Sequence, residues 1–110
     1  MIFDRLIRIA DRLAKVEAGS AAADAAIHEA LRLAWPVPLY TTDAAATRTL
    51  LPAGFEWMPT THSGGWVYAP CRRSGLDGEW HYPHHGQFGR TLPLSMCGGV
   101  MRAWAMLAKG

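Results

Sequence analysis

The stretch from residue 39 to residue 57 constrains the fold most, because the start of a helix can be located within it. Thr41 or Thr42 is predicted to be the N-cap, since a threonine hydroxyl accepts a hydrogen bond from an N–H of the first helical turn. Asp43 adds a carboxylate at the positive end of the helix dipole. Alanines follow directly, and alanine has the highest helix propensity of all residues.

The same stretch also indicates where this helix ends. Pro52 cannot continue a helix, and Gly54 supplies a backbone that can turn freely. Residues 55–58 then alternate in the way that is typical of a strand. The stretch is therefore predicted to be a helix, a turn and a strand, which favours a fold containing both kinds of element.

The remaining elements follow from periodicity and from turn-forming residues. The predicted helices are 2–18, 20–34, 42–51 and 91–107, the predicted strands are 55–58, 66–69 and 79–82, and the predicted turns and loops are 59–65, 71–78 and 84–90. A three-stranded sheet cannot leave both faces bare, so helices must pack on it. We therefore predict an α+β fold with a three-stranded antiparallel sheet. Residues 1–35 are predicted to be an N-terminal helical extension, and residues 36–110 an α+β sandwich domain.

Apolar residues in the first predicted helix recur at intervals of four and three, which places them on one stripe. They are Ile2, Leu6, Ile9, Leu13 and Val16. The stripe can pack on the core of its own chain, or it can form a short coiled coil between protomers. Both interpretations stay open at this point, and we expect a homo-oligomer that associates through this helix.

Three further residue patterns predict helix ends and close packing. Ser20 is predicted to cap the second helix and Thr91 the last one. Gly98 and Gly99 lie inside the last predicted helix, where a glycine costs up to ~1 kcal/mol relative to alanine. Two glycines there indicate that a strand or another helix passes close to this helix.

The charge pattern excludes some classes of function. A net charge of +2 does not favour direct nucleic-acid or membrane binding. Charged residues interrupt the start of the chain, so we expect no signal peptide, and no apolar run approaches the ~20 residues that span a bilayer. Cys71 and Cys97 do not form a disulfide scaffold and suggest a reducing compartment. We expect a soluble protein of the cytoplasm.

A histidine cluster is the most conspicuous candidate for chemistry. His81, His84 and His85 could hold zinc if His62 or a cysteine joined them, but no metal-binding spacing is present. Cys97 with His84 or His85 could form a nucleophile and base, yet no pattern aligns them. We therefore expect no metal site, no cofactor and no enzyme activity, and we interpret these histidines as a surface loop.

Arginines and aromatic residues gather in one segment and suggest a binding site for an anionic, nucleotide-like molecule. Paired guanidinium groups hold phosphate well, and aromatic faces can stack on a base. The candidate ligand-binding residues are Arg72, Arg73, Arg90, His84, His85, Trp66, Trp80 and Tyr82. The alternative interpretation is that the tryptophans belong to the core and the arginines only keep the surface charged.

Residues 38–104 resemble small phage and prophage proteins that carry the phage ABA-sandwich type of domain. The motifs that carry the resemblance are 38–45, 51–57 and 91–100, and the match covers about two thirds of the chain. The resemblance implies a sandwich fold and an accessory protein of a phage or prophage that acts in the bacterial cytoplasm. It supplies no catalytic residue.

Two functions follow as hypotheses. The first is a non-enzymatic counter-defence protein that sequesters a small nucleotide-like signalling ligand of host immunity. The alternative is an inhibitor that docks on a host defence protein such as a CRISPR effector, using its helical face and the loops of residues 71–90. A structural accessory of the phage particle is a third, weaker hypothesis.

Overall fold

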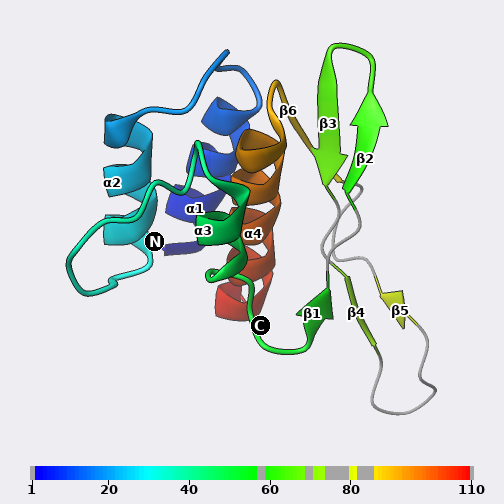
Figure 1. The fold of residues 1–110 in the computed structure, drawn as a ribbon. Coiled ribbons are helices and arrows are strands. Elements are labelled where there is room, and N and C mark those ends of the chain that lie inside the picture. The colour runs from blue at the N-terminus through cyan, green and yellow to red at the C-terminus, as the bar shows by residue number, and fades with distance from the viewer. Residues whose placement is uncertain (1, 57–58, 69–70, 74–79, 82–85, 110) are drawn as a thin grey trace.

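The computed structural model describes residues 2–56, 59–68, 71–73, 80–81 and 86–109 (Figure 1). The helices are α1 (Ile2–Leu13), α2 (Ala21–Ala30), α3 (Ala44–Arg48) and α4 (Leu92–Lys109). The strands are β1 (Phe55–Glu56), β2 (Pro59–His62), β3 (Gly65–Tyr68), β4 (Cys71–Arg73), β5 (Trp80–His81) and β6 (Gln87–Gly89). The predicted α+β class, with a three-stranded antiparallel sheet and an N-terminal helix, is confirmed.

The strands form two three-stranded antiparallel sheets, in the orders β2-β3-β6 and β1-β4-β5. The turn predicted over residues 59–65 is shorter in the structure, because residues 59–62 form β2 and only residues 63–64 turn the chain toward β3. The β-branched Thr60 and Thr61 suit a strand, and Gly64 at φ 77° supplies the turn. The strand predicted at 55–58 corresponds to β1, which pairs with β4.

The loop predicted at 84–90 is also corrected, because it contains β6, which pairs with β3. Glycine makes this pairing possible. A side chain at Gly65 would collide with the backbone of Gly89, and a side chain at Gly89 would collide with the backbone of Ser95 in α4. The glycines that suggested a flexible loop are therefore small residues at a close contact between sheet and helix.

Helix α4 is the centre of the fold. In Figure 1, α1 runs beside α4, and the β2–β3 hairpin lies on the other side of α4 from α2. One hydrophobic core joins Leu6, Leu13 and Ile27 to Leu94 and Val100. The core thus draws on both sides of residue 35, and the division at that residue stays a prediction. No described helix is long and apolar enough to cross a membrane.

The first helix ends at Leu13, so the prediction that it reaches residue 18 is wrong. Leu6 and Leu13 are buried against the core, whereas Ile2 and Val16 are exposed. The stripe therefore packs mainly within its own chain. Association of protomers through this helix stays a prediction.

The side chain of Gln87 connects β6 to both long helices. Its amide donates a hydrogen bond of 2.8 Å to the Ala10 carbonyl in α1, and its oxygen accepts one of 2.7 Å from Arg102 in α4. A side chain at Gly98 would collide with Gln87, so the expectation that a strand passes close to this helix is confirmed at Gly98. Arg102 also pairs with Asp11, which strengthens the same junction.

The N-cap of α3 is Asp43, whose carboxylate accepts a hydrogen bond of 2.9 Å from the Ala45 N–H. The prediction of Thr41 or Thr42 as this cap is therefore wrong, because Thr41 is buried and bonded to Asp24. The predicted caps at the other helices are confirmed. Ser20 accepts from Ala23 at the start of α2, and Thr91 accepts from the Leu94 N–H at the start of α4.

Candidate functional site

The predicted ligand-binding residues are divided between the two sheets. Arg72 and Arg73 lie in β4, and Arg73 is directly opposite Trp80 of β5. Trp66 lies in β3 of the other sheet, where it is half-buried, and Arg90 is exposed just before α4. The structure brings together the backbones of Arg73 and Trp80, and it does not place Arg90 in that sheet.

Three further residues of the predicted site, Tyr82, His84 and His85, lie outside the described residues. The assignment of a nucleotide site to these residues therefore stays a prediction. Within the described ranges, no three side chains of His, Cys, Asp or Glu lie close enough to hold a metal ion.

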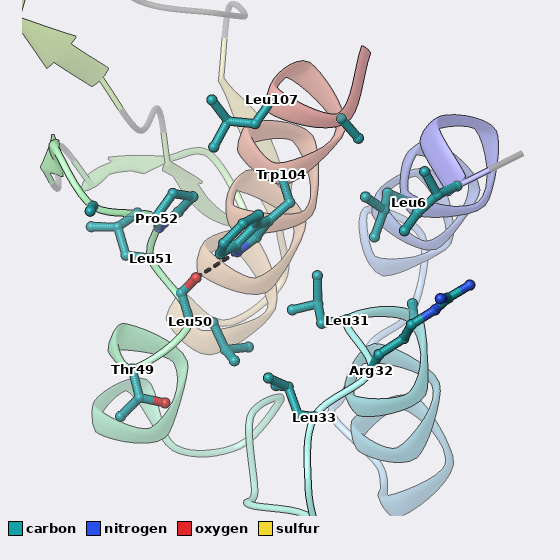
Figure 2. A pocket seen from close by; sticks show the side chains of 14 residues that line it. Leu6, Leu31, Arg32, Leu33, Thr49, Leu50, Leu51, Pro52, Trp104 and Leu107 are labelled. Atoms are coloured by element: carbon teal, nitrogen blue, oxygen red, sulfur yellow. Dashed lines mark hydrogen bonds between the residues drawn. The ribbon is translucent and has the colours of Figure 1, made fainter. Parts of the chain in front are cut away.

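A different site is open among the helices. A cavity of about 480 Å³ lies between α1, the end of α2, the segment after α3 and the C-terminal half of α4 (Figure 2). Aliphatic side chains from these elements form most of its wall, among them Ile2, Leu6, Leu31, Leu33, Leu50 and Leu107. Small-molecule sites in proteins have this range of volume and this mostly apolar character.

Trp104 and Thr49 each carry one polar side-chain group in the wall of the cavity. Both groups donate hydrogen bonds to backbone carbonyls of the protein. The indole N–H of Trp104 donates a hydrogen bond of 2.7 Å to the Leu50 carbonyl, drawn as a dashed line in Figure 2. The Thr49 hydroxyl donates one of 2.7 Å to the Ala46 carbonyl. These bonds fix the wall on the α3 side and leave neither side chain with a hydrogen to offer a ligand.

Arg32 is the one charged side chain that lines the cavity in the described part of the chain. Its backbone is left-handed, with φ 54°, just after the end of α2. The Arg32 N–H bonds to the Glu29 carbonyl at 3.0 Å, and the Leu33 N–H bonds to the His28 carbonyl at 3.1 Å. This pair of bonds is a Schellman motif, which normally carries glycine where Arg32 stands.

Buried polar contacts hold the loop that carries Arg32. His28 lies 2.8 Å from the Ala34 carbonyl through Nε2 and 2.8 Å from the Tyr40 hydroxyl through Nδ1. A carbonyl can only accept, so Nε2 carries a hydrogen, and in the neutral imidazole Nδ1 then accepts from the Tyr40 hydroxyl. The loop after α2 is thereby tied to the segment before α3. The backbone at Arg32, which lines the cavity, is therefore fixed by hydrogen bonds on both sides.

Cys97 is buried in α4 and does not have the properties of a nucleophile. Burial raises the pKa of the Cys97 thiol to about 12, so the thiol stays protonated near neutral pH. Its sulfur lies 3.2 Å from the Tyr40 carbonyl, to which it donates. Thr47 donates to the same carbonyl at 2.6 Å. Cys97 therefore joins α4 to the segment before α3.

The sequence interpretation missed the cavity. Its wall is made by residues at the ends of several helices, and no periodic pattern identifies such a set. One signal was present: Leu31, Leu33, Leu50 and Leu51 follow or end helices, where polar residues are more usual. Nothing in the sequence marks the left-handed backbone of Arg32.

Comparisons of the chain with protein-family models, with curated proteins and with solved structures found no match. The resemblance of residues 38–104 to the phage ABA-sandwich domain therefore stays a prediction. What the protein binds has to be inferred from the chemistry of its own cavity.

Proposed function

We propose that this protein is a non-enzymatic binding protein that takes up the apolar part of a small molecule in the cavity between α1, α2 and α4. The observation that carries the proposal is an apolar hollow of about 480 Å³ in a chain of 110 residues. The hollow opens to water, because Ile2, Leu33 and Leu107 of its wall are exposed. Its volume and its mostly apolar wall match those of small-molecule sites in proteins.

Exposure of the wall supports the same proposal. Ile2, Leu33 and Leu107 line the cavity, yet each keeps about two fifths of its surface in contact with water. A ligand that covered these side chains would gain about 25 cal/mol for each Å² of apolar surface removed from water. The wall is held by hydrogen bonds at Trp104 and His28, so little ordering is needed on binding.

The proposal keeps the class of protein that the sequence favours, a binder without catalysis, and changes the site. A nucleotide-like ligand would need the arginines of residues 72–73, which do not line this cavity. The setting that accompanies the proposal is the one implied by the resemblance: an accessory protein of a phage or prophage in the bacterial cytoplasm. Counter-defence is the role that we propose for it there.

Binding to a host defence protein is a second candidate, and one observation favours it. Trp35 is 84 % exposed and Leu39 is 62 % exposed, and both belong to the segment between α2 and α3. Large exposed aromatic residues are typical anchors of protein interfaces. An inhibitor of a defence complex would use this segment, whereas a small-ligand binder would use the cavity.

The test uses N-phenyl-1-naphthylamine, a neutral apolar dye whose fluorescence rises in an apolar environment. We expect saturable binding of one dye per chain. Ala108→Trp should weaken it at least tenfold, because Ala108 lines the cavity and is exposed, so that the larger side chain can enter the hollow. Ala25→Trp is the matched control, since Ala25 is an exposed helical alanine that does not line the cavity. Equal loss or equal retention in both variants would contradict the proposal.

A further inference from the structure

The proposed function does not specify the chemical class of the ligand. The position of Arg32 indicates which class the cavity accepts. An arginine in a left-handed conformation is uncommon, because the Cβ atom of any residue other than glycine crowds the backbone there. Glycine would satisfy the Schellman motif at the end of α2 without this cost. Strain of this kind, found at the edge of a cavity, is a reason to ask what the side chain does there.

The guanidinium of Arg32 has no ion-pair partner among the described residues. The nearest acid along the helix, Glu29, is paired with Arg5 at 3.4 Å. In Figure 2 the Arg32 side chain extends from the end of α2 toward α1, and Arg32 is among the residues that line the cavity. Within the described ranges, this positive charge is thus unpaired and lies beside an apolar hollow.

The polar groups of the wall point to one kind of ligand. The Trp104 N–H and the Thr49 hydroxyl hydrogen are already donated to backbone carbonyls. Arg32 therefore supplies the free side-chain donors of the lining, and it supplies them with a positive charge. A ligand with many hydroxyl or amide groups would leave those groups unsatisfied in this cavity. A cationic ligand would be repelled.

Resting on the proposed function, we propose that the natural ligand is an amphipathic acid: an unbranched or lightly branched alkyl chain that fills the cavity and ends in one anionic group held by Arg32. A carboxylate fits the guanidinium with two parallel hydrogen bonds. Arg32 lines the cavity and is exposed, so the alkyl chain can remain inside while the acid stays near water.

The other reading of Arg32 is purely structural, because a cation near a helix C-terminus interacts favourably with the helix dipole. The two readings differ in the effect of Arg32→Gly. Under both readings glycine relieves the left-handed strain. If Arg32 holds the ligand, Arg32→Gly also loses the binding of the acid. If the charge serves only the helix dipole, the binding of the acid is unchanged.

The experiment is a calorimetric titration with decanoate, decyl phosphate, 1-decanol and decylamine, each below its micelle concentration. We expect decanoate to bind at least tenfold more tightly than 1-decanol, and decylamine more weakly than either. Arg32→Gln should abolish the preference for decanoate and leave 1-decanol binding unchanged, and Arg32→Lys should retain part of it. Arg8→Gln is the control, since Arg8 is exposed on α1 and does not line the cavity.

Shortening the acid provides an independent readout. Each methylene group removed should weaken binding about fourfold while the chain lies within the cavity. If decyl phosphate binds as tightly as decanoate, the site accepts either anionic group. If decyl phosphate binds more weakly, the natural ligand is a carboxylate. Binding to vesicles of phosphatidylglycerol without binding to monomeric decanoate would overturn the inference in favour of a lipid surface.

The outcomes separate the two proposals. If 1-decanol binds and decanoate binds no more tightly, or if Arg32→Gln keeps the preference, the acid ligand is wrong and the cavity proposal stands. If neither compound nor the neutral dye binds, the cavity proposal fails as well.

Discussion

Asp24 in α2 accepts two hydrogen bonds from Thr41, one from its backbone N–H and one from its hydroxyl, each 2.7 Å long. Both residues are almost inaccessible to water, at 2 % and 1 % exposure. The pair fixes the segment before α3 against α2. Tyr40, which directly precedes Thr41, forms a hydrogen bond with His28. His28 in turn holds the Ala34 carbonyl, so this pair supports the loop that carries Arg32.

The first prediction concerns this pair. Asp24→Ala should lower the free energy of unfolding by about 3 kcal/mol, because two buried donors of Thr41 lose their acceptor. Thr41→Val removes only the hydroxyl and should cost about 1 to 2 kcal/mol. Urea unfolding followed by circular dichroism measures both. The exposed Glu17→Ala is the control and should change stability by less than about 0.5 kcal/mol; an Asp24→Ala effect as small as this would refute the role of the pair.

The second prediction concerns alkaline pH. Burial raises the pKa of Cys97 to about 12, and burial also raises the pKa of Tyr40. In the unfolded chain the Cys97 thiol has its ordinary pKa and loses its proton from about pH 8.5 upward. In the folded chain the thiol keeps its proton at these pH values, because its pKa is raised. The stabilisation is complete below that pH and is lost as pH rises toward 12.

Urea midpoints at pH 7.0, 9.0 and 10.5 test this dependence. Above about pH 9, the unfolding free energy of the wild type should fall with a slope about 1.4 kcal/mol per pH unit steeper than that of Cys97→Ala. Cys97→Ala removes the thiol and keeps an apolar side chain, so ionisation of other groups affects both proteins alike. Parallel curves for the two proteins would show that Cys97 does not contribute.

The third prediction is a coupling between Gln87 and Gly98. Gly98→Ala should destabilise the wild type, because the added Cβ collides with the Gln87 side chain. In a Gln87→Ala background the obstructing atoms are gone. There, Gly98→Ala should be neutral or stabilising by up to about 1 kcal/mol, since alanine is the better helix former. A double-mutant cycle of unfolding free energies gives the coupling, and additive effects would contradict the packing described for β6 on α4.

The fourth prediction separates the two candidate functions. Trp35→Ala should leave the free energy of unfolding within about 0.5 kcal/mol of the wild type, because the side chain is 84 % exposed. It should also leave dye and decanoate binding unchanged, since Trp35 does not line the cavity. If this variant instead loses binding to a defence complex that the wild type inhibits, the protein-binding candidate gains direct support over the cavity.

Local sequence patterns predicted helices well where the cap and the buried stripe agree. Ser20 and Thr91 cap α2 and α4, and Leu6 and Leu13 face the core as their spacing indicates. At the start of α3, Thr41, Thr42 and Asp43 are all residue types that favour the N-cap position, so the local sequence does not single one of them out. The buried carboxylate of Asp24, 17 residues earlier, accepts the hydrogen bond of the Thr41 hydroxyl, so Thr41 does not cap α3. This long-range contact is not visible in the local sequence.

The strands and the site were harder to predict, for physical reasons. Gly65 and Gly89 lower strand propensity, yet they stand where backbones touch, so β6 was read as a loop. The cavity depends on how the ends of α1, α2 and α4 meet, which no single segment specifies. A left-handed arginine gives no signal in composition, spacing or charge.

The most direct test of the central claim is an NMR titration of methyl-labelled protein with 1-decanol. Binding in the cavity predicts saturating shift changes for the methyl groups of Leu31, Leu33, Leu50 and Leu107, with nuclear Overhauser contacts from the alkyl chain to the same groups. It predicts no change at Leu39 or at Val67 in β3, which lie outside the cavity. Shifts confined to Leu39 and its neighbours, or no saturable shift at all, would contradict the account.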